Sequence, residues 1–194
     1  FFNVVRLGTG RLAAHVDVDK IVFTGSTATG QSILRASAGN MKRVSLELGG
    51  KSPVIVCTDA DLERAVPIAA MSVFANSGQI CIAGSRLFIE RPIHDEFVER
   101  VSAYAAKLRS GDGADPETEI GPLISPRQLE RVTGFIADGA RQGARLVTGG
   151  NRITEGALGS GNFIAPSVFS GVTDDMRIAR EEIFGPVISA LPFD

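Results

Sequence analysis

Short apolar runs along this chain alternate with longer stretches in which apolar residues recur at helical spacing. The short runs, bounded by glycine, proline or polar residues, predict strands at residues 20–24, 44–48, 53–57, 86–90, 145–148, 163–169 and 187–191. Helical spacing predicts helices from Ser26 to about Ala38, from an N-cap at Asp59 through Phe74, from Pro92 to Leu108 and from Ser125 to Gly143.

This alternation of strands and helices predicts an α/β fold with a largely parallel sheet and flanking helices, because parallel strands need crossover connections. Residues 111–122 and 151–161 are rich in turn residues and predict loops, and a domain boundary is expected near Gly49 and Gly50.

Composition narrows the class of protein. The chain has 194 residues, 44% of them hydrophobic and 22% charged, which is typical of a globular domain, or of one domain plus part of another. A net charge of −2 gives no reason to expect a nucleic-acid or membrane-surface partner. The most apolar stretch, residues 65–75, is too short to span a bilayer. We therefore expect a cytoplasmic protein, and the start at Phe1 without a methionine suggests an internal segment of a longer chain.

Two cysteines make neither a disulfide framework nor, with only His15 and His94 beside them, a metal site, so no metal is expected. Cys57 ends an apolar run and is expected to pack in the core. Cys81 instead lies in a loop-like segment between Gly78 and Gly84. Such a cysteine is either a reactive nucleophile or a small buried hydrophobe, and position alone leaves both readings open.

Three further motifs carry candidate chemistry, each with a plain alternative. In FTGSTATG, the turn Gly25-Ser26-Thr27 and the following Gly30 suit a phosphate at a helix N-terminus, or serve only to start a helix. Glu47, at a strand end before two glycines, suits a general base, or pairs with Lys51 or Arg43 in solvent.

The third motif is EEIFGPV, in which an acid, an aromatic residue and a Gly-Pro turn are compressed into a few positions. The carboxylate of Glu182 suits hydrogen bonds from a ribose diol, and the ring of Phe184 suits packing against a flat ligand ring. Alternatively, Phe184 only fills the core beside a turn.

Together these motifs resemble the NAD(P)-dependent aldehyde dehydrogenase superfamily. The stretches VDKIVFTGST, VSLELGGKSPVIV, FANSGQICIAGSR, EIGPLIS and EEIFGPV stand in that family's order, and Cys81 lies 34 residues after Glu47, as the family's nucleophile follows its base. The resemblance favours a chemical role for Cys81.

The resemblance implies that Cys81 attacks an aldehyde, that a thiohemiacetal and then a thioester form, and that Glu47 activates the hydrolytic water. It implies NAD or NADP as cofactor, with the phosphates at Gly25, Ser26, Thr27 and Gly30. It further implies that the Leu48 carbonyl contacts the nicotinamide amide, that Glu182 holds the ribose and that Phe184 packs near the nicotinamide.

The family's chain is more than twice this length. Residues 1–48 are accordingly expected to be part of a dinucleotide-binding, Rossmann-like domain, and residues 49–194 a catalytic domain truncated at its C-terminus. The parent protein is expected to be a homodimer or homotetramer acting on a small aldehyde, and this segment alone to be weak or inactive. Two alternatives stay open, a non-catalytic remnant of the same fold and a relative that transfers the acyl group to coenzyme A.

Overall fold

The computed structural model describes residues 9–194, so the expectation drawn from Phe1 lies outside the described residues. The chain divides into two compact units that join between Gly49 and Gly50.

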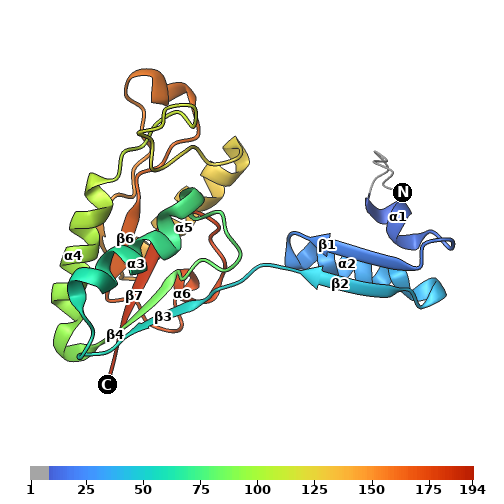
Figure 1. Cartoon of the computed structure of the whole chain (residues 1–194), viewed down its shortest axis with the longest axis horizontal. Coiled ribbons are helices and arrows are strands. Elements are labelled where there is room, and N and C mark those ends of the chain that lie inside the picture. The colour runs from blue at the N-terminus through green and yellow to red at the C-terminus, as the bar shows by residue number, and fades with distance from the viewer. Residues whose placement is uncertain (1–8) are drawn as a thin grey trace. The chain divides into compact units, whose positions relative to one another are not determined.

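The N-terminal unit is built around one strand–helix–strand crossover (Figure 1). Helix α1 (Thr9–Ala14) precedes strand β1 (Lys20–Thr24), helix α2 (Thr27–Ser37) and strand β2 (Arg43–Glu47). The two strands pair in parallel, with Thr24 opposite Glu47. Strand β2 begins and ends one residue earlier than the alternating pattern predicts.

The C-terminal unit contains a five-stranded sheet in the order β3-β4-β7-β6-β5. Its strands are β3 (Pro53–Val56), β4 (Arg86–Glu90), β5 (Arg145–Thr148), β6 (Ser167–Ser170) and β7 (Val187–Phe193). All neighbours are parallel except β5 and β6. The predicted α/β class with a largely parallel sheet is therefore confirmed.

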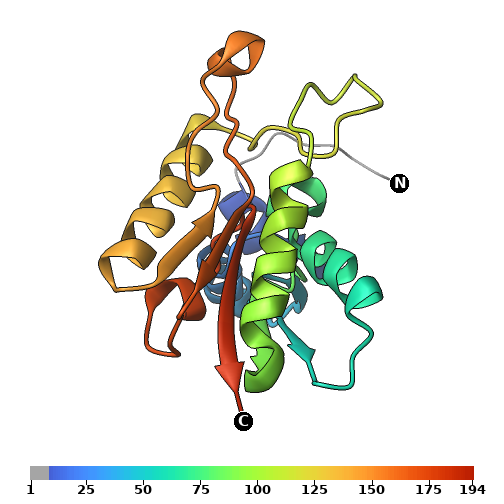
Figure 2. The same ribbon diagram turned by 90° about the vertical axis from the view of Figure 1, so that its left-hand side faces the viewer.

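Helices cover both faces of this sheet. Successive side chains of a strand point to opposite faces, and apolar strand residues are buried on each of them. Helices α3 (Leu62–Phe74) and α4 (His94–Lys107) cover one face, and α5 (Pro126–Arg141) and α6 (Arg177–Arg180) the other; Figure 2 shows α4, in green, and α5, in orange-yellow, on either side of the red strand β7. Strand residues buried with α3 and α4 are Val56, Leu87, Ile89, Val168, Ile188 and Ala190. Those buried with α5 and α6 are Phe169, Val187 and Leu191.

Three local predictions are wrong. The N-cap of α3 is Asp61, not Asp59, because the Asp61 carboxylate accepts the Glu63 and Arg64 amides. Cys57 is exposed rather than packed in the core, because β3 ends at Val56 and Cys57 already begins a turn, closed by the Ala60 amide. The strand predicted over residues 163–169 is confined to β6; before it, Ile164 makes only an isolated bridge with Arg152.

No helix within residues 9–194 combines the length and the apolar character needed to cross a membrane.

Candidate active site

Two of the predicted motifs meet at one edge of the N-terminal unit, since neighbouring parallel strands end on the same side. Gly25 directly follows β1 and Glu47 ends β2, and the Gly25 amide donates a hydrogen bond to the Glu47 carbonyl at 3.0 Å. Ser26 then caps α2, its hydroxyl accepting the Thr29 amide at 3.2 Å. The glycine turn and the candidate base are thus joined through their backbones.

This edge has features that suit an anionic group. Among residues 9–194 the first amides of α2, those of Thr27 and Ala28, donate to no protein acceptor, and such amides at a helix start attract phosphate.

A side chain at Gly30 would collide with Leu48, whose Cδ2 would lie 2.7 Å from an added Cβ. Gly30 therefore lets Leu48 pack directly on α2.

In the C-terminal unit, Cys81 lies at the tip of a tight turn. The Ala83 amide donates to the Ile80 carbonyl at 3.1 Å, which places Cys81 and Ile82 at the two central positions. Cys81 is partly exposed, and no acceptor in the described part of the chain takes its amide hydrogen. The thiol and a free backbone donor are therefore presented together, as an oxyanion site requires.

The two glycines that bracket the cysteine are required by close packing. Gly78 has a φ of 70°, and a side chain there would collide with the Gly185 carbonyl. A side chain at Gly84 would collide with Val54 and lie 2.9 Å from the Ser72 hydroxyl. The loop is thus fixed against its neighbours on both sides of the thiol.

Two other segments lie at the same edge of the sheet as the Cys81 loop, because all three precede neighbouring parallel strands. Gly50 and Lys51 precede β3, the Cys81 loop precedes β4, and the loop of residues 181–186 precedes β7, so all three lie at the amino edge of the sheet. Gly50 joins them: its amide donates to the Glu182 carboxylate at 3.1 Å, and a side chain there would collide with the Cys81 carbonyl.

The EIGPLIS stretch supports the Cys81 loop from outside the sheet. The buried Ser77 hydroxyl donates to the Gly121 carbonyl at 2.7 Å. The Gln79 carboxamide accepts the Ile124 amide at 2.9 Å and lies 3.5 Å from the Pro122 carbonyl. This stretch therefore holds the loop by polar contacts more than forty residues away in sequence.

Lys51 is a site residue that the sequence reasoning treated only as a partner for Glu47 in solvent. Its ammonium nitrogen is buried and has no hydrogen-bond partner among the described residues. Burial, and then the nearby Arg86, lower the pKa of Lys51 to about 8, although Glu182 and Glu181 oppose the shift. No pattern in the sequence distinguishes this lysine from an exposed one.

The α5 residues Gln128 and Arg131 were also missed. Both hold the backbone of the loop of residues 181–186, Gln128 through the carbonyls of Ile183 and Phe184 and Arg131 through that of Glu182. One signal was present in the sequence: the spacing of Ser125 and Gln128 is that of a capping box.

The predicted site residues fall into two groups. Cys81, Glu182 and Phe184 belong to the C-terminal unit, whereas the residues of the N-terminal unit are Gly25, Ser26, Thr27, Gly30, Glu47 and Leu48. Gly50 links the Cys81 carbonyl and the Glu182 carboxylate. The pairing of Glu47 with Cys81 involves both units and stays a prediction.

Comparison with known proteins shows the family of the chain. The chain matches the family model described as "Aldehyde dehydrogenase family" over residues 2–194. Among solved structures, HpcC from Thermus thermophilus is 46% identical with a TM-score of 0.92, over 95% of this chain and 36% of that one.

Two further matches are named for their activity. An NAD+ complex of the Bacillus cereus aldehyde dehydrogenase is 48% identical with a TM-score of 0.89, over 94% of this chain and 36% of that one. Betaine aldehyde dehydrogenase from Staphylococcus aureus, in complex with NAD+, is 36% identical with a TM-score of 0.93, over 95% and 37%. This chain spans little more than a third of their length, and it belongs to the aldehyde dehydrogenase family.

Proposed function

We propose that the protein carrying this chain oxidises a small aldehyde to a carboxylic acid with NAD or NADP, using Cys81 as nucleophile and Glu47 as base. Membership of the family and the two relatives solved with NAD+ support the reaction class and the cofactor. The observation that carries the assignment of Cys81 is its place at the tip of a turn, with its own amide free of protein acceptors among the described residues.

The chemistry follows from these groups. The Cys81 thiolate adds to the aldehyde carbon, and the oxygen of the resulting thiohemiacetal takes up negative charge that the Cys81 amide stabilises. NAD(P)+, when bound, supplies the acceptor for the hydride that leaves this carbon. Glu47 then takes a proton from the water that attacks the thioester, which releases the acid and restores the thiol.

The cofactor is proposed to use groups of both units. The amides at the start of α2, with Gly25, Ser26 and Thr27, would bind its phosphates, and the Leu48 carbonyl its carboxamide. Glu182 accepts one hydrogen bond, from Gly50, and retains acceptor capacity for a ribose diol. Phe184 would pack beside the nicotinamide.

The two units then have different roles, the N-terminal unit in dinucleotide binding and the C-terminal unit in carrying the thiol. Because the solved relatives are nearly three times as long, we propose that the isolated chain is weak or inactive and that a longer protein forms the full site. A homodimer or homotetramer is the proposed assembly of that longer protein.

The test is the formation of reduced nicotinamide from short aliphatic and aromatic aldehydes. The longer protein is expected to give turnover, and its Cys81→Ala variant none above background, because alanine cannot form the thiohemiacetal. Cys57→Ala, at the exposed second cysteine, is the matched control and should keep full activity. An active Cys81→Ala variant would remove Cys81 as the nucleophile.

A further inference from the structure

The loop that carries Glu182 and Phe184 contains a conformation that needs support. Phe184 has a φ of 57°, in the left-handed region that disfavours side chains other than glycine. The residue after it, Gly185, is packed so closely on Val132 of α5 that a side chain there would collide. The loop therefore lies directly on α5 with a strained residue at its centre.

Gln128 supports the strained residue from both sides. Its side-chain nitrogen donates to the Ile183 carbonyl at 3.1 Å and to the Phe184 carbonyl at 2.8 Å, and these carbonyls belong to the peptide groups that flank Phe184. The carboxamide nitrogen of Gln128 thus donates to both peptide groups that flank Phe184.

The use of Gln128 departs from what its position in the helix favours. Ser125 caps α5 by accepting the Gln128 amide at 3.2 Å, which is half of a capping box. In the complete box the glutamine side chain returns to the capping residue. Here it reaches a loop 55 residues further along the chain.

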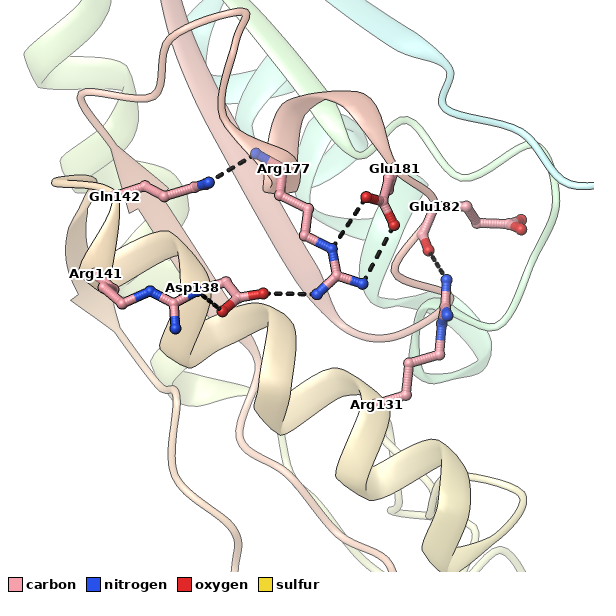
Figure 3. A network of polar contacts seen from close by, with 7 residues as sticks. All are labelled: Arg131, Asp138, Arg141, Gln142, Arg177, Glu181 and Glu182. Carbon is pink, nitrogen blue, oxygen red and sulfur yellow. Dashed lines mark hydrogen bonds and ion pairs between the residues drawn. The ribbon is translucent and has the colours of Figure 1, made fainter.

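Ionic contacts fasten the rest of the loop to the same helix, as Figure 3 shows. Arg177 pairs with Asp138 of α5 at 2.6 Å and with Glu181 at 3.0 Å, and its guanidinium lies 4.1 Å from the centre of the Phe135 ring. Arg131 donates to the Glu182 carbonyl at 2.5 Å. The Glu182 carboxylate itself points away from α5 (Figure 3), so its backbone is held while its side chain stays directed elsewhere.

We propose that Gln128 is a positioning residue, which holds Phe184 in its left-handed conformation and thereby sets where the Phe184 ring and the Glu182 carboxylate meet the cofactor. Gln128 need not touch substrate or cofactor for this. The link to the cofactor rests on the proposed function, whereas the support of the loop does not.

The experiment uses the 194-residue chain labelled with 4-fluorophenylalanine at its 11 phenylalanines, followed by fluorine NMR. A Phe184→Leu variant assigns the Phe184 resonance. Gln128→Ala is expected to shift and broaden that resonance while leaving the other resonances in place. Arg127→Ala, one residue away and exposed on the same helix, is the control and should leave the resonance unchanged.

Gln128→Glu adds a signature that a merely structural role would not give. A carboxylate repels the two carbonyls, whereas a protonated carboxyl donates to one of them. The Phe184 resonance of this variant is therefore expected to differ from the wild type at neutral pH and to return toward it on acidification.

A titration with NAD+ separates the two proposals. It uses the longer protein, labelled in the same way and with Phe184→Leu again assigning the resonance, because the cofactor site is proposed to be complete only there. NAD+ is expected to move the Phe184 resonance of the wild type, with an affinity about tenfold weaker in Gln128→Ala, as the loss of two hydrogen bonds implies. An unchanged Phe184 resonance in Gln128→Ala, or none of the expected pH dependence in Gln128→Glu, overturns the positioning role. A changed resonance with equal NAD+ affinity overturns its link to the cofactor. If NAD+ shifts no resonance in any sample while the Gln128 effects appear, the positioning role stands and the proposed cofactor contact at Phe184 fails.

Discussion

Backbone strain is concentrated next to the candidate nucleophile. Asn76, Ser77 and Gly78 all have positive φ, of 49°, 55° and 70°. For the two residues with side chains this costs roughly 1–2 kcal/mol each. The Ser77 hydroxyl on the Gly121 carbonyl and the Asn76 carboxamide on the Gln79 carbonyl, at 3.2 Å, hold the loop in this form. Such strain persists only where neighbouring groups fix it, and here it sets the direction of the Cys81 turn.

The buried ammonium of Lys51 is a second feature of this site that costs folding free energy. Removing its charge is therefore expected to raise the stability of the chain by an amount that depends on pH. Its pKa is about 8 in the folded chain, against an ordinary value of 10.5. Between pH 8 and pH 10.5 Lys51 binds more protons in the unfolded chain than in the folded chain, so its contribution makes the wild type more stable as the pH rises. The charge therefore costs most below pH 8, and Lys51→Met should stabilise the chain there by about 1–3 kcal/mol.

Urea unfolding of the wild type and of Lys51→Met, measured at pH 7 and at pH 10, checks this sign. The stability difference between the two should shrink as the pH rises. Lys107→Met, at an exposed lysine at the end of α4, serves as control. A Lys51→Met chain that is less stable than the wild type at pH 7 would show that the ammonium is favourably paired in solution.

What the sequence reveals at the residue scale depends on how far away a residue's partners lie. Cys81 and Glu182 stand in short motifs whose glycines and prolines already indicate an unusual backbone. Gln128 and Lys51 cannot be recognised in this way, because the groups that surround them come from segments distant in sequence, such as the loop before β7. Cys57 shows the reverse error, since an apolar run before it says nothing about where the strand ends.

At the scale of elements, the site is arranged by strand ends. In the N-terminal unit the candidate groups follow parallel strands, at their carboxyl edge, and in the C-terminal unit they precede parallel strands, at their amino edge. Periodicity predicted most of these strands, but it could not predict the order β3-β4-β7-β6-β5, which requires pairing between strands far apart in sequence. The convergence of Gly50, Cys81 and Glu182 therefore became visible only with the sheet.

Two glycines of α5 test how this helix is packed against α6 and the sheet. An added Cβ at Gly134 meets nothing within 4 Å, so Gly134→Ala should stabilise the chain by about 1 kcal/mol through helix propensity. At Gly139 the added carbon would lie 2.9 Å from Ile178 and 3.3 Å from Phe169, both fully buried. Gly139→Ala should therefore be less stable than Gly134→Ala by about 1–3 kcal/mol.

Thermal or urea unfolding of the two variants side by side measures this difference, each acting as the other's control for the change from glycine to alanine. Equal stability of the two variants would mean that α6 yields to the added methyl group, and that α5 is not the rigid support on which the further inference depends.

At the scale of the whole molecule, the candidate residues are divided between two units linked in the chain at Gly49 and Gly50. The Gly50 amide donates to the Glu182 carboxylate, and the Cys81 carbonyl occupies the space that a side chain at Gly50 would need. Glu47 lies three residues before Gly50 in sequence. The family resemblance rested on this order of motifs, and the match over residues 2–194 confirms it. The roles of the individual residues stay predictions, because they concern a reaction that is proposed for a longer protein.

The measurement that tests the central claim most directly is the mass of the covalent intermediate. The longer protein carrying Glu47→Gln, mixed with an aldehyde and NAD+ and quenched in acid, is expected to accumulate one acyl group on the peptide containing Cys81, because the thioester forms but its hydrolysis lacks a base. The same protein with Glu47 intact should show little of this adduct and a faster steady-state rate. The account is contradicted if the acyl group is found on another residue, or if Glu47→Gln turns over at the full rate without any adduct on Cys81.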